Sequence, residues 1–249
     1  MRLNKFLAQA GIASRRKSDE LIQMATTEVN GKLCLDPAYD VKESDVVNFD
    51  GQKISPVKEK IVVMFHKPKR VITTVKDTHG RKTVMDFVPP NIRLTPIGRL
   101  DQDTTGLLLL TNDGDLHQYL THPKNQIPKD YEAVIEGRLT PSQIQKLARG
   151  IYIGDKEYGK AEIVNQETKK GRSSLIMRLR HGKKREIRRI LYRLKLKLIS
   201  LKRIRFSNLT LGTLTEGNYR QLTLNVSGID LKYRLLVILF FIGIISSRR

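Results

Sequence analysis

The sequence predicts an α+β fold in two units, and three observations lead to this prediction. Residues 1–58 combine two short amphipathic helix patterns with a hairpin signal. Residues 52–60 (QKISPVKEK) are polar and contain one proline, which is typical of a linker. From Ile61 onward several strand patterns follow one another with few helices between them, and this order favours a larger, mainly antiparallel sheet. We therefore expect domains at 1–58 and 59–228, followed by a tail at 229–249.

The N-terminal unit has clear local signals. Apolar residues within 3–10 share one helical face, and Gly11 is placed to end that helix. Ser14 is a suitable N-cap for a second helix. Asn30 and Gly31 lie between alternating residues, which is the strongest short hairpin signal in this unit. A further strand is expected at 46–49.

The larger unit is expected to contain strands separated by two helices. Strands are predicted at 61–66, 107–110, 131–136 and 174–180, and helices at 141–149 and 185–194. The first helix has the most complete signature, because Thr140 can cap it, Pro141 can start it and Gly150 can end it. The second helix carries arginines along one side.

The stretch GRLDQDTTGLLLLTNDGD at 98–115 contains the most informative candidate site. Two acidic residues, Asp101 and Asp103, lie close to Arg99 and directly before a strand expected to be buried on both faces. Loops that enter rigid elements often carry functional groups. On composition alone, either aspartate could be the reactive group.

The charge of the chain points to a polyanionic partner. The 46 Lys and Arg outnumber the 25 Asp and Glu, so the formal charge is +21 at pH 7. Residues 178–205 contain thirteen Lys or Arg, with only Glu186 opposing them. Nucleic acid is the commonest partner for such density, and binding should be strongly salt-sensitive. The competing interpretation is a merely solvated basic face.

Other residue patterns exclude several classes of protein. The single Cys34 excludes an internal disulfide framework, and the five scattered histidines lack paired metal-ligand spacing. We therefore expect no bound metal. The N-terminal MRLNKFLAQAG lacks the apolar core of a secretory signal, so a cytoplasmic protein is expected. The apolar run at 235–245 is shorter than the roughly 20 residues that span a bilayer. A buried or interfacial tail is expected there, with membrane contact as the minor alternative.

Residues 1–58 resemble the alpha-L RNA-binding motif of the S4-like domains. The resemblance rests on RLNKFLAQAGIASRR at the start and VNGK in the hairpin. It implies phosphate contacts by Arg15, Arg16 and Lys17 at a helix N-terminus. A solvated helix face is the alternative for these three residues. The chain departs from the family at 24–28, where MATTE replaces the usual glycine and basic residue.

Four segments of the larger unit resemble the ribosomal RNA pseudouridine synthases that carry such an N-terminal domain. They are, in the family's order, HKPKRVITT at 66–74, GRLDQDTTGLLLLTNDGD at 98–115, KDYEAVIEG at 129–137 and RHGKKREIRRIL at 180–191. The resemblance covers residues 1 to about 225. It implies that a uridine is detached from its sugar, rotated and rejoined through carbon, without a cofactor or metal.

The resemblance also assigns roles to residues. Asp101 corresponds to the essential aspartate, Arg188 to its cationic partner and Tyr131 to the active-site tyrosine. Arg99 is the candidate that supports a flipped-out nucleotide, and an ion pair with Asp103 or another acid is its alternative. Lys67 and Pro68 are expected to shape a turn beside the site. RNA-binding candidates within the basic stretch are Lys183, Lys184, Arg185 and Arg189.

The resemblance favours large-subunit (23S) ribosomal RNA as the substrate. The alternatives are the same reaction on 16S rRNA and a non-catalytic assembly factor that binds rRNA. The expected partner is ribosomal RNA or a ribosomal subunit assembly intermediate. The protein is expected to be a monomer without membrane contact.

Overall fold

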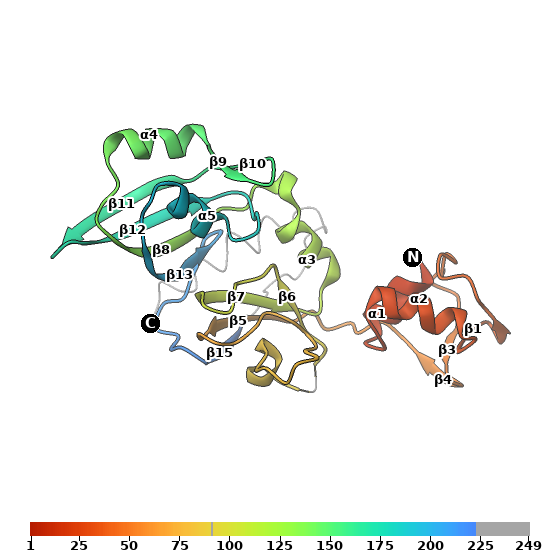
Figure 1. Cartoon of the computed structure of the whole chain (residues 1–249). Helices are drawn as coiled ribbons and strands as arrows, with labels where there is room; N and C mark the ends of the chain where they lie inside the picture. The colour runs from red at the N-terminus through yellow and green to blue at the C-terminus, as the bar shows by residue number, and fades with distance from the viewer. Residues whose placement is uncertain (91, 223–249) are drawn as a thin grey trace. The chain divides into compact units, whose positions relative to one another are not determined.

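The computed structural model describes residues 1–90 and 92–222 (Figure 1). The described residues divide into two compact units, one formed by Met1–Lys60 with Asn112–Gly114 and the other by the remaining described residues. The apolar run at 235–245 and the tail at 229–249 lie outside the described residues.

The first unit packs two helices against a small antiparallel sheet. Its elements are α1 (Leu3–Gln9), α2 (Arg15–Gln23), β1 (Thr27–Val29), β2 (Lys32–Leu33), β3 (Val47–Phe49) and β4 (Gln52–Ile54). The strand order is β2-β1-β3-β4. The core consists of fully or almost fully buried aliphatic residues contributed by both layers and by one loop. They are Leu3, Leu7, Ile22, Val29, Val41 and Val47.

The local signals of this unit act as the sequence predicts, with one correction. The Ser14 hydroxyl accepts a hydrogen bond from the Lys17 amide at 3.2 Å and so caps α2. Asn30 and Gly31 connect β1 to β2 with φ values of 53° and 73°, as a tight hairpin turn requires. The linker expected at 52–60 is wrong in its first part, because residues 52–54 form β4. The preceding turn folds the chain back so that β4 pairs with β3.

The second unit is built on a nine-stranded, mostly antiparallel sheet. Its main path is β11-β12-β8-β13-β7-β5-β15, with β14 paired to β13 and β6 to β7. The strands of the sheet are β5 (Val62–Lys67), β6 (Thr95–Ile97), β7 (Thr105–Thr111), β8 (Lys129–Glu136), β11 (Glu162–Lys169), β12 (Arg172–Leu179), β13 (Leu198–Phe206), β14 (Leu209–Thr210) and β15 (Tyr219–Leu222). Among the pairings between described strands, only β7 with β13 is parallel.

The centre of the sheet is buried on both faces, as the apolar run before Thr111 predicts. Along β7, Leu107 and Leu109 join one apolar cluster, whereas Leu108 and Leu110 join another on the opposite face. This alternation follows from the two-residue period of a strand. The strand is therefore rigidly held at the point where the loop carrying Asp101 enters it.

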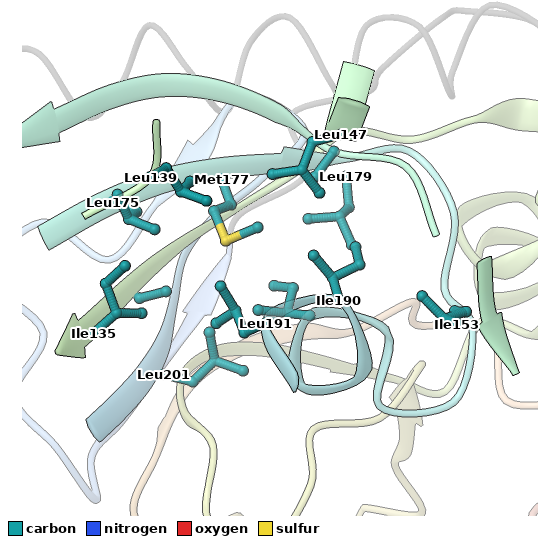
Figure 2. Packing of buried hydrophobic residues seen from close by; sticks show 13 residues of the cluster. Ile135, Leu139, Leu147, Ile153, Leu175, Met177, Leu179, Ile190, Leu191 and Leu201 are labelled. Atoms are coloured by element: carbon teal, nitrogen blue, oxygen red, sulfur yellow. The ribbon is translucent and has the colours of Figure 1, made fainter. Parts of the chain in front are cut away.

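Two helices cover another part of the sheet. α4 (Pro141–Arg149) begins with a capping box between Thr140 and Gln143 and ends at Gly150. α5 (Glu186–Arg193) is followed by β13. Figure 2 shows their core, in which Leu147 of α4 and Ile190 of α5 meet aliphatic side chains of β8, β12 and β13. The core thus fixes the first turn of α5, which carries Arg188.

A close approach between β7 and β13 brings distant segments together. Gly106 has φ +109°, and a Cβ added there would lie 2.2 Å from the carbonyl oxygen of Arg203. Arg203 is buried, and its Nε donates a hydrogen bond to the Leu107 carbonyl at 2.7 Å. Only glycine allows this backbone contact. As a result, the start of β7 lies directly beside β13, the strand that follows α5.

Candidate active site

The carboxylate of Asp101 lies between two guanidinium groups of the α5 region. Its Oδ2 is 3.5 Å from Arg188 Nε and 3.7 Å from Arg185 Nη1, and its side chain is 36% exposed. Among the described residues, none forms a hydrogen bond or ion pair with Oδ1. The two cations stabilise the negative charge of Asp101, while one carboxylate oxygen stays available to a substrate.

Arg188 is positioned by contacts on both sides. Its side chain is 22% exposed, and Nη2 donates a hydrogen bond to the Thr104 hydroxyl at 3.3 Å. At the start of the same helix, buried Glu186 accepts hydrogen bonds from the backbone amides of Lys160 and Lys183, both at 3.3 Å. Burial raises the pKa of Glu186, and those amides oppose the rise. Glu186 thus ties the N-terminus of α5 to the segments around it.

Lys67 holds the loop that carries Asp101, a role that the sequence did not reveal. This lysine is fully buried, and its Nζ donates to the carbonyls of Pro68 at 2.9 Å, Gln102 at 3.3 Å and Thr104 at 2.9 Å. Burial lowers the pKa of Lys67 to about 8, although the nearby charges of Asp103 and Asp101 oppose the shift. A lysine directly after the buried strand VVMFH was the available signal, because a buried ammonium needs acceptors.

Tyr131, Arg99 and Asp101 line one pocket of about 100 Å³, together with the first turn of α5. Tyr131 lies on β8 and packs against two of the apolar clusters. Arg99 forms no ion pair among the described residues, so the salt bridge considered for it is absent there. Asp103 is exposed and does not line this pocket. The pocket thus brings together Asp101 and Arg99 of one loop, Tyr131 of β8 and Arg188 of α5, which are three separate parts of the chain.

The remaining predicted RNA-binding residues fall into different environments. Arg15 and Arg16 are exposed in the first turn of α2, whereas Lys17 is bound to Glu20 at 2.7 Å. Lys184 is exposed, and Lys183 lines the pocket and donates to the Tyr158 carbonyl.

Arg189 differs from the expectation, because its guanidinium is used within the protein. It donates to the carbonyls of Ile153 at 3.0 Å and Gly154 at 2.7 Å and to Glu157 at 2.6 Å. These acceptors belong to the hairpin of β9 (Ile151–Gly154) and β10 (Glu157–Gly159). Arg189 therefore fastens that hairpin to α5, and only 19% of its side chain is exposed.

Two absences apply to the residues that the structure describes. No group of three or more His, Cys, Asp or Glu within 1–90 and 92–222 could hold a metal ion. No helix in this part of the chain is long and apolar enough to cross a membrane.

The fold and the pocket define an RNA-modifying enzyme with a separate RNA-binding unit, and comparison with known proteins supports this class. The RNA pseudouridylate synthase family matches residues 61–192, and the S4 domain matches residues 1–47. The chain belongs to the RNA pseudouridylate synthase family and carries an N-terminal S4 domain. It is therefore an isomerase that binds RNA and forms pseudouridine.

Individual relatives agree with this assignment. The chain is 40% identical over 226 residues to ribosomal large subunit pseudouridine synthase B of Bacillus subtilis (strain 168), covering 89% of this chain and 92% of that protein. It is 32% identical over 225 residues to the dual-specificity RNA pseudouridine synthase RluF of Escherichia coli (strain K12), covering 90% and 76%. A crystal structure of a pseudouridylate synthase matches with a TM-score of 0.63 and 26% identity, covering 90% of this chain and 96% of that one. The predicted fold and enzyme class are thus confirmed.

Proposed function

We propose that this protein converts a specific uridine of 23S ribosomal RNA to pseudouridine, with Asp101 as the catalytic carboxylate. The observation that carries the catalytic part is the position of Asp101, whose Oδ2 faces Arg188 and Arg185 in a pocket shared with Tyr131. The 23S target is supported by the 40% identity to a protein named as a large-subunit synthase. In this proposal the protein acts as a monomer in the cytoplasm, and it binds rRNA or a ribosomal subunit assembly intermediate.

The substrate uridine must leave its stack to reach Asp101. Flipping a nucleotide out of a helix costs a few kcal/mol, so contacts in the pocket have to offset that cost. Tyr131 offers a ring for stacking on the uracil or a hydroxyl for proton transfer, and Arg99 supports the flipped-out RNA backbone. The hydrogen bond from Arg188 to Thr104 holds the guanidinium of Arg188 beside the carboxylate of Asp101.

RNA docking is assigned to cations that remain accessible. Arg15 and Arg16 extend from the first turn of α2, where backbone amides also favour phosphate. Lys183, Lys184 and Arg185 directly precede α5, and Lys183 and Arg185 line the pocket. Lys17 can join the first group, because its exposed pair with Glu20 is weak and a phosphate can replace it.

The direct test compares Asp101→Asn with wild type and with Asp103→Asn as a matched control. Each purified protein is incubated with an unmodified 23S rRNA transcript, and pseudouridine is mapped by carbodiimide-dependent primer extension. We expect Asp101→Asn to reduce the rate of product formation by at least about a hundredfold, because it removes the reactive charge. RNA binding and the activity of Asp103→Asn should stay close to wild type. Equal pseudouridine yield from Asp101→Asn and wild type would refute the catalytic assignment.

A second candidate is a target in another RNA. It is favoured by the similarity to RluF, which is named as a dual-specificity RNA synthase. Mapping pseudouridine in 23S rRNA, 16S rRNA and tRNA from a deletion strain distinguishes these targets. Loss of a 16S or tRNA pseudouridine alone contradicts the 23S assignment. RNA binding without any lost pseudouridine supports the assembly factor.

A further inference from the structure

A groove larger than the Asp101 pocket lies directly beside it. The groove has a volume of about 710 Å³ and is lined by Arg185, Arg188, residues 192–193 at the end of α5 and residues 195–198, which lead into β13. Five of its lining residues are Arg or Lys, and none is acidic. Because Arg185 and Arg188 also line the Asp101 pocket, the two hollows share a wall. We call this feature the α5–β13 groove.

The groove contains an aromatic ring with no packing role. Tyr192 is 79% exposed, whereas Ile190 and Leu191 beside it are buried in the core. The ring therefore lies on the outer side of α5. A solitary exposed tyrosine would need no explanation, but this one lines a groove of cations. Aromatic rings combined with cations form the stacking platforms that bind single-stranded nucleic acid.

Three cations of the groove, Arg193, Lys195 and Lys197, lie outside the Asp101 pocket, and none of them has a strong acidic partner among the described residues. The Arg193 guanidinium lies over the Tyr152 ring, 5.7 Å from its centroid. The turn after α5 is fixed by hydrogen bonds from the Lys195 amide to the Tyr192 carbonyl at 3.0 Å and from the Leu196 amide to the Leu191 carbonyl at 2.9 Å. Lys195 is exposed in this turn with φ +56°. Lys197 contacts Glu136 at 2.8 Å, but both side chains are largely exposed. A surface pair of this kind is worth little, so a phosphate can replace it.

We propose that the α5–β13 groove binds a single-stranded RNA segment next to the target uridine. One nucleobase stacks on Tyr192, and neighbouring phosphates contact Arg193, Lys195 and Lys197. An unpaired segment fits better than a duplex, because stacking on a protein ring requires a base with a free face. The proposal rests on the proposed function only in placing the target uridine at Asp101.

The test compares Tyr192→Ala with Tyr192→Phe, which keeps the ring. Binding is measured by fluorescence anisotropy with an oligouridylate of twelve nucleotides. KM and kcat are measured with an unmodified 23S rRNA transcript. We expect Tyr192→Ala to weaken oligouridylate binding and raise KM by about tenfold, with kcat unchanged, because stacking of one base is lost. Tyr192→Phe should behave as wild type. Since the side chain is 79% exposed, both variants should melt at the wild-type temperature.

A charge variant gives an independent measurement. Lys195→Gln should make the dependence of log K on log salt shallower by about 0.7, the value for one phosphate contact with a single strand. The matched control is Lys170→Gln, at the turn between β11 and β12, which should leave the slope unchanged. Wild-type oligouridylate binding by Tyr192→Ala and an unchanged slope for Lys195→Gln would overturn the proposal. A wild-type enzyme that makes no pseudouridine contradicts the proposed function instead, while the oligouridylate measurements still decide the groove.

Discussion

Replacing Lys67 by Met should strongly reduce activity, although Lys67 does not contact the substrate in the proposed function. The Lys67 ammonium donates to three carbonyls, and two of them, those of Gln102 and Thr104, lie one and three positions after Asp101 in the same loop. Met has a similar length and apolar character but no donors. In Lys67→Met the loop therefore loses the group that fixes its backbone, and the carboxylate of Asp101 can move relative to Arg188.

The magnitude follows from two opposing terms. A pKa that falls from 10.5 to about 8 corresponds to about 3 kcal/mol of disfavoured charge, which Met would relieve. Hydrogen bonds from a charged donor contribute about 1.5–3 kcal/mol each, and Met removes three of them. The bonds outweigh the relieved charge, so we expect the free energy of unfolding to fall by about 2 kcal/mol. For a protein of this size that lowers Tm by about 4–8 °C.

The assay measures kcat on the 23S rRNA transcript together with Tm by circular dichroism. A displacement of about 1 Å at a reactive group can cost a hundredfold in rate, so kcat should fall by about that factor at a temperature where the variant is folded. Lys69→Met is the matched control, because Lys69 is exposed in the following turn and should be neutral. Wild-type kcat for Lys67→Met would show that the loop holds Asp101 without this lysine.

The remaining predictions concern pH and the fold. The pKa of Lys67 is about 8 in the folded protein and 10.5 in the unfolded chain, so the unfolded chain holds this proton more tightly. Between these pH values the contribution of Lys67 to the free energy of unfolding therefore increases as pH rises. The kcat of the wild-type enzyme should nevertheless fall above pH 8, because the neutral amine loses a hydrogen bond to the loop. A kcat that stays flat to pH 9.5 contradicts this. Gly106→Ala should lower the free energy of unfolding by about 4 kcal/mol through backbone overlap and strain, measured by urea titration. Gly171 also has a positive φ, but an added Cβ would meet no atom there. If Gly171→Ala lowered the free energy of unfolding as much as Gly106→Ala does, backbone overlap at Gly106 would not be the cause. Thr140→Ala should lower the free energy of unfolding by about 1 kcal/mol, whereas Thr140→Ser, which keeps the capping hydroxyl, should change it little. Equal stability of Thr140→Ala and wild type would show that the capping box does not stabilise α4.

Elements with strong local signals were predicted correctly. α4 has the predicted cap and end because Thr140 and Pro141 at its start and Gly150 at its end each act on residues close to them in the chain. β7 is buried on both faces because four consecutive leucines cannot all face water. These signals depend on neighbouring residues alone, so the sequence is enough to interpret them.

β13 shows where local reasoning was insufficient. The sequence LKLKLISLKRIRF was interpreted only as part of a basic stretch, yet residues 198–206 form a strand between β7 and β8. Its Arg203 is buried because the Leu107 carbonyl, 96 residues away, accepts its hydrogen bond. Arg189 likewise follows the basic pattern of the sequence but is occupied by the β9–β10 hairpin. Whether a cation faces solvent or a carbonyl depends on partners that its neighbours do not specify.

The sequence by itself determined the class of the protein and its two-unit fold, because motifs and charge are local and additive properties. Only the tertiary structure showed that Arg185 joins Arg188 beside Asp101, that Lys67 fastens the loop of Asp101, and that the groove containing Tyr192 shares a wall with the Asp101 pocket. Asp101 and Arg188 are 87 positions apart, and the parallel pairing of β7 with β13 brings their segments together. Such a site depends on pairing between segments far apart in the sequence, which no local pattern specifies.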